Sequence, residues 1–117
     1  MINDSGIVLN RLNNALLATI QATLMPEVLQ QFKGSLLNEL VETKVKYILC
    51  DLSAVDIIDI EEFSSLSSIL EMAGLMGAKT IFIGMPPSIA ATIVDYDIDI
   101  TKFQYALTID EGLALAQ

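Results

Sequence analysis

Residues 51–79, DLSAVDIIDIEEFSSLSSILEMAGLMGAK, decide how the chain folds. The run that leads into them, Tyr47–Leu52, is apolar almost throughout and predicts a central strand buried on both faces. Residues from about Ile60 to Met76 have helical spacing, and Gly77 is a natural stop for that helix. An acidic loop therefore joins a buried strand to a helix, and this junction is the candidate site.

The acids at the start of this helix have a structural explanation. Asp59 precedes the helix and Glu62 follows three residues later, which is the spacing of a capping box. Glu61 and Glu62 also complement the positive end of the helix dipole. Paired carboxylates can perform acid–base catalysis, but the sequence supplies no histidine, nucleophile or metal set beside them. We therefore interpret the acids as helix caps.

A helical wheel separates this helix into two sides. The side expected to face the sheet carries Phe63, Leu66, Ile69, Leu70 and Ala73. The side expected to face outward carries Ser64, Ser68, Glu71, Met72 and Leu75. Two neighbouring apolar side chains among serines and an acid indicate either a contact surface or an ordinary exposed face.

Four serines in five positions, 64–68, raise the question of catalysis or modification. A catalytic serine needs a base beside its hydroxyl, and the chain has no histidine and no G-x-S-x-G motif here. Small serines also let a helix lie close to a partner, which is the role that we favour.

The composition fits one domain over residues 1–117, with 53% hydrophobic residues and a net charge of -9. This charge repels nucleic acid and anionic lipid, so we expect protein partners and no cofactor. The single cysteine, Cys50, lies in an apolar run and is interpreted as a buried core residue rather than a nucleophile. No apolar run approaches the ~20 residues that span a bilayer. We expect a cytoplasmic protein.

The remaining patterns predict an α/β fold with a mixed sheet on which helices pack. A hairpin that turns at Asn13-Asn14 comes first, and helices and strands alternate after it. Pro26 opens a helix with Leu29, Phe32, Leu36 and Leu40 on one face. The other expected elements are strands over Ile7–Leu12, Ala15–Gln21, Thr80–Ile83 and Phe103–Leu107, and helices over Pro87–Tyr96 and Thr108–Ala116. The last helix should start with a capping box formed by Thr108 and Glu111.

This order of elements resembles the STAS domain, the SpoIIAA-like fold of bacterial anti-sigma factor antagonists. The motifs that carry the resemblance are DLSAVDIID at 51–59, LMGAK at 75–79 and GMPPSIA at 84–90, with LLNELVET at 36–43 and DEGLALA at 110–116. The resemblance runs from about Ile7 to Leu115 and is greatest to stressosome scaffold antagonists of RsbS type.

The resemblance implies a non-enzymatic switch protein that binds its partner through the loop and helix after Asp59. The implied partners are switch kinases with a GHKL-type ATPase fold, anti-sigma factors and STAS-domain paralogues, in homo- or hetero-oligomers. The expected partner-binding residues are Asp56, Asp59, Ile60, Glu61, Ser64, Ser68 and Met72.

The chain departs from the family at the position that is phosphorylated. A serine follows the motif aspartate in the family, but Ile60 follows Asp59 here and has no hydroxyl. Ser64, one helical turn further on, is a candidate displaced acceptor. A phosphate adds about -1.5 to -2 charge at a helix start, where Glu61 and Glu62 already place negative charge. These residues favour a binding surface that is independent of phosphorylation.

Two other classes of protein stay open. The chain could be a purely structural STAS subunit of a dimer or shell, without a switching role. A small enzyme would need an unanticipated ligand pocket. Some STAS domains are cytoplasmic parts of anion transporters, but no membrane segment or linker is visible in this sequence.

Overall fold

The computed structural model describes residues 2–4, 6–21 and 23–117 and contains a six-stranded sheet. The strands follow one another across the sheet in chain order: β1 (Ile2–Asp4), β2 (Ile7–Leu12), β3 (Ala15–Ile20), β4 (Tyr47–Asp51), β5 (Lys79–Ile83) and β6 (Gln104–Ala106). The first three pair antiparallel, and β3 to β6 pair parallel. The predicted mixed sheet is confirmed.

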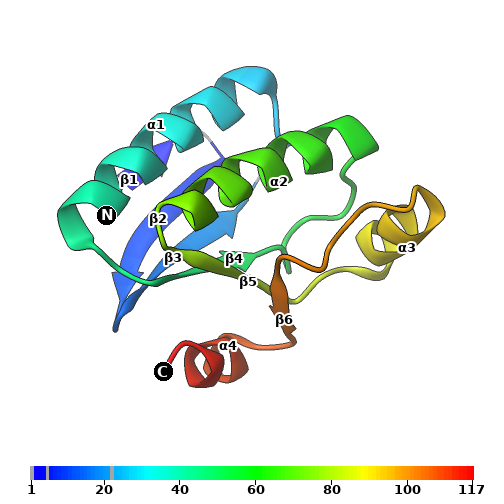
Figure 1. The fold of residues 1–117 in the computed structure, drawn as a ribbon. Coiled ribbons are helices and arrows are strands. Elements are labelled where there is room, and N and C mark those ends of the chain that lie inside the picture. The colour runs from blue at the N-terminus through cyan, green and yellow to red at the C-terminus, as the bar shows by residue number, and fades with distance from the viewer. Residues whose placement is uncertain (1, 5, 22) are drawn as a thin grey trace.

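Helices cover the two faces of the sheet unequally (Figure 1). The helices are α1 (Pro26–Thr43), α2 (Ile60–Leu75), α3 (Pro87–Asp95) and α4 (Ile109–Leu115). α1 and α2 lie side by side on one face, whereas the short α4 lies on the other face against β4, β5 and β6. α3 packs Ile89 and Ile93 into the core that α1 and α2 share. Parallel pairing requires these crossover connections, because a tight turn joins only antiparallel strands.

The boundaries of the first elements follow from turn and cap chemistry. Leu12 pairs with Ala15, so only two residues turn the hairpin, and Asn13 takes a left-handed φ of 56° there. Pro26 starts α1, where a missing N–H is harmless. Lys44 closes α1 with a left-handed φ of 57°, and its N–H donates to Leu40 O at 3.0 Å.

The core has two parts that lie on opposite faces of the sheet. The larger part, under α1 and α2, contains the rings of Phe63 and Phe82 with centroids 5.8 Å apart. The smaller part, under α4, contains Leu49, Ile81 and Ile83. Cys50 is fully buried in the larger part, as predicted. Burial, and to a lesser extent the charge of Asp51, raises the pKa of the Cys50 thiol, so it is a packing residue.

Two features differ from the sequence-based expectations. β1 was not predicted, because a three-residue edge strand carries almost no periodic signal. The capping box at α4 is only half formed. Thr108 Oγ1 accepts from the Glu111 N–H at 3.2 Å, but Glu111 Oε2 accepts from the Leu107 N–H at 3.1 Å, one residue before the expected partner. Several other predicted ends differ by one residue, which is within the usual uncertainty of helix and strand ends.

We predict that Gly84→Ala destabilises the fold strongly. Gly84 has a φ of +62°, and a Cβ there would lie 2.9 Å from Ser53 Cβ. The conformational strain and the clash should together lower the free energy of unfolding by about 2 kcal/mol, measured by urea denaturation.

Gly34→Ala is the matched control, because Gly34 lies within α1 and a Cβ there meets nothing within 4 Å. It should raise the free energy of unfolding by up to about 1 kcal/mol. Equal effects of the two substitutions would contradict the close approach at Gly84.

Candidate protein-interaction site

The loop between β4 and α2 is held at its start by Asp51. Asp51 Oδ1 accepts from the N–H and the hydroxyl of Ser53, at 2.9 and 2.7 Å. Leu52 is buried and its N–H donates to Ile83 O at 3.0 Å. Ser53 is therefore exposed and bonded within the loop. The chain leaves the sheet in one defined direction.

The start of α2 has the predicted capping box. Asp59 Oδ1 accepts from the Glu62 N–H at 2.7 Å, and Glu62 Oε1 accepts from the Asp59 N–H at 3.0 Å. Glu61 adds a further acid in the first turn. Two orphan N–H groups and the positive end of the helix dipole are thus satisfied from within the chain. An added phosphate would have to compete with these carboxylates.

Ile57 is a surface residue that sequence reasoning missed. The apolar residues of the loop diverge: Val55 and Ile58 are buried, whereas the Ile57 side chain is 82% exposed. The sequence signal was a short loop rich in apolar residues, of which the core accommodates Leu52, Val55 and Ile58 but not Ile57. Ile60, one of the expected partner-binding residues, is half-buried. Ile57 is therefore the more accessible of the two isoleucines.

The structure places five of the predicted residues around the start of α2. Together with Ile57 they form the surface that we call the α2 entry surface, made of Asp56, Ile57, Asp59, Ile60, Glu61 and Ser64. Its serine, its acids and Ile57 are exposed, and Ile60 is half-buried. Ser88 on α3 steadies the loop, because its hydroxyl donates to Asp56 O at 2.9 Å. Ser68 is exposed one turn beyond Ser64.

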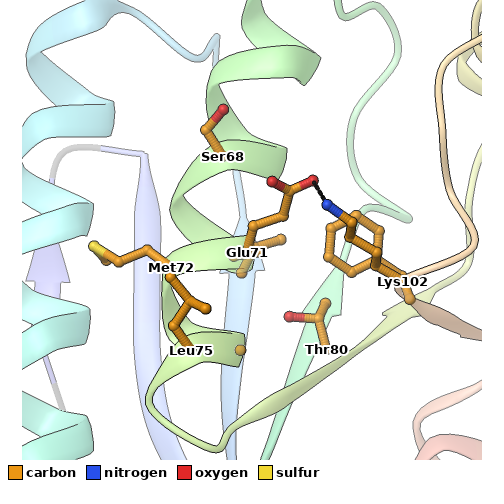
Figure 2. A pocket seen from close by; sticks show the side chains of 9 residues that line it. Ser68, Glu71, Met72, Leu75, Thr80 and Lys102 are labelled. Carbon is orange, nitrogen blue, oxygen red and sulfur yellow. Dashed lines mark ion pairs between the residues drawn. The ribbon is translucent and has the colours of Figure 1, made fainter.

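Met72 does not belong to this surface, and its predicted outward orientation was wrong. It is half-buried and packs against the larger core. Figure 2 shows its side chain pointing toward α1, which covers this side of α2. Leu75, on the same predicted face, is 92% exposed. A helical wheel shows the sides of one helix but not which side a second helix covers.

A cavity of about 520 Å³ adjoins the α2 entry surface, between the first turns of α1 and α2. From α1 it is lined by Leu29 and Lys33, and from α2 by Asp59, Glu61 and Ser68, among others. Met25, just before α1, is 52% exposed beside it. The combination of an apolar floor and an acidic rim suits a protein segment with apolar and basic side chains better than a nucleotide.

The part of the chain that the structure describes contains no helix long and apolar enough to cross a membrane. The same residues contain no group of three or more histidine, cysteine or acidic side chains that could hold a metal ion. The geometry of the site is that of a rigid, acid-capped surface with apolar side chains at its centre.

The chain belongs to the STAS domain family, whose model matches residues 6–112. The resemblance inferred from the sequence motifs is thereby confirmed. The described site lies inside the matched region.

The chain is similar to proteins of the RsbR and RsbS types and to a solved chain of the stressosome. The chain is 27% identical over 103 residues to the RsbT co-antagonist protein RsbRA of Bacillus subtilis, a match that covers 88% of this chain and 38% of RsbRA. It thus spans less than half of the length of that relative. A Ser→Glu variant of RsbS from Moorella thermoacetica superposes with a TM-score of 0.81 at 25% identity, covering 96% of this chain and 95% of that one. A chain of the stressosome, described as a signal integration and transduction hub, also has a TM-score of 0.81 and 25% identity, over 93% and 95% of the two chains.

We predict that Asp59→Ala lowers the free energy of unfolding by about 1 kcal/mol, because it removes the side chain that caps α2. The measurement is urea denaturation followed by circular dichroism. Asp56→Ala is the control, since it removes the same charge from the same loop but no side-chain hydrogen bond among the described residues. It should change the free energy of unfolding by less than about 0.5 kcal/mol. Equal losses in both variants would show that charge, not capping, matters at Asp59.

Proposed function

We propose that this chain is a non-enzymatic regulatory scaffold, an anti-sigma factor antagonist of the stressosome type. In this proposal it binds a switch kinase with a GHKL-type ATPase fold, or an anti-sigma factor, through the α2 entry surface. The observation that carries the proposal is the exposed Ile57 beside half-buried Ile60, framed by acids on a helix start that the capping box fixes. Such a surface loses little conformational entropy on binding.

The charge of the chain supports a protein partner. The net charge of -9 disfavours nucleic acid and anionic membrane surfaces. The first turn of α2 carries two glutamates and no basic residue. The preferred partner therefore presents an apolar pocket with basic residues at its edge, which complements both parts of the surface.

Binding should not depend on phosphorylation at the usual family position. Ile60 has no hydroxyl to accept a phosphate, and the carboxylates of Asp59 and Glu62 already accept from the N–H groups of Glu62 and Asp59, respectively. We propose that the acids keep the surface in one state, with Ile60 as part of its apolar centre. Ser64 is exposed one turn away and is the acceptor to map if a kinase adds phosphate.

A purely structural STAS subunit is the second candidate, and the uneven cover of the sheet favours it. α4 contacts β4, β5 and β6, whereas the same face of β2 and β3 carries half-buried Val8, Leu12 and Leu17. Pairing of this apolar area with another STAS domain would explain its composition. Mass measurement by light scattering, for the chain alone and with its partner, separates the two candidates. A structural subunit forms a multimer without kinase or anti-sigma factor binding.

We predict that Ile57→Asp and Ile60→Asp each weaken binding to the switch kinase of the same organism more than tenfold, measured by isothermal titration calorimetry. The reason is that burying a carboxylate where an apolar anchor fitted leaves an unpaired charge in the interface. Leu107→Asp is the control, because Leu107 is 78% exposed, lies outside this surface and receives the same charge. The proposal fails if the two isoleucine variants keep wild-type affinity, or if the control loses as much.

A further inference from the structure

A second cavity of about 520 Å³ lies beneath the C-terminal half of α2, beyond the α2 entry surface. Figure 2 shows its lining side chains, which come from α2, from Thr80 on β5 and from the segment before β6. Leu70, Met72 and Leu75 line it from α2, and Phe103 lines it from the segment before β6. Its volume lies within the range of small-molecule sites.

Thr80 is the polar group in this cavity that the fold does not explain. It is 2% exposed, and its Oγ1 has no hydrogen-bond partner among the described residues. A buried hydroxyl without a partner costs free energy, whereas valine would fill the same space in a strand without that cost. Thr80 also lines the cavity, and its hydroxyl oxygen is shielded from solvent, so a ligand there would have to move a neighbouring side chain to supply the missing hydrogen bond.

The walls around Thr80 are apolar and leave room for a ligand. The Phe103 ring is held edge-on against Phe82, with centroids 5.2 Å apart. Gly74 lines the cavity, and a Cβ added there would meet nothing within 4 Å, so the glycine leaves this space open. An apolar body such as a small ring or short chain fits between these surfaces.

The charged residues at the cavity indicate that the ligand is neutral. Lys102 Nζ lies 3.4 Å from Glu71 Oε1, and both side chains are about half exposed. Lys102 is the one cation that lines the cavity, and Glu71 already pairs with it. The net charge of -9 also disfavours the binding of an anionic ligand. Ser68 lines both this cavity and the one between α1 and α2, so a ligand here would lie next to the proposed partner surface.

We propose that this cavity is a binding site for a small, neutral, mainly apolar molecule with one hydroxyl or carbonyl oxygen. The oxygen forms a hydrogen bond with Thr80 Oγ1, and the apolar body lies between α2 and Phe103. This proposal is independent of the partner proposed for the α2 entry surface.

The test uses benzyl alcohol and toluene as matched probes, titrated into the ¹⁵N-labelled chain and followed by amide NMR shifts. Benzyl alcohol should give saturable shifts at Thr80, Leu75 and Phe103. Thr80→Val should weaken benzyl alcohol about fivefold, the usual effect of one net hydrogen bond, and leave toluene unchanged. It should also raise the melting temperature, because it removes an unsatisfied hydroxyl.

Ser67→Ala is the control, because Ser67 is also buried with an unpaired hydroxyl but does not line this cavity. It should leave the affinities of both probes unchanged. Gly74→Leu should weaken both probes more than tenfold by filling the space. Shifts confined to other residues, an unchanged affinity of benzyl alcohol in Thr80→Val, or a lower melting temperature of that variant would overturn the proposal.

Discussion

The burial of β4 on both faces is the constraint on which the rest of the structure depends. Ile48 and Cys50 pack under α1 and α2, while Leu49 packs under α4, and none of the three is exposed. A strand between two parallel neighbours, covered on both faces, has no freedom to slip in register without exposing apolar side chains. The chain therefore leaves β4 at a fixed point, and the acidic loop before α2 starts from a rigid base.

The capping box converts this rigid exit into a defined surface. The side chains of Asp59 and Glu62 satisfy two of the orphan N–H groups at the start of α2, and their charge complements the helix dipole there. The family resemblance implies a phosphorylated serine at this position, and we propose that this chain, with Ile60 there, binds its partner without being switched. This arrangement fits a scaffold that holds a regulator rather than one that releases it on modification.

The main features of the fold could be predicted from sequence because they rest on local signals. The buried strand, the cap at Asp59 and the hairpin at Asn13 each follow from the chemistry of a few neighbouring residues. The sequence-based predictions failed where tertiary contacts decide whether a side chain is buried or exposed. α1 covers Met72, the core leaves no room for Ile57, and the unpaired hydroxyl of Thr80 becomes visible only when its neighbours are known. The sequence indicates which residues surround the start of α2, but not which of their side chains are exposed.

The measurement that tests the central claim most directly is intact mass after incubation with the switch kinase and Mg-ATP, with size-exclusion chromatography of the same sample. The account predicts a stable complex in which this chain carries no added phosphate. A chain that gains one phosphate and then dissociates would contradict it. Peptide mapping of that phosphate to Ser64 would show that the switching position has moved by one helical turn.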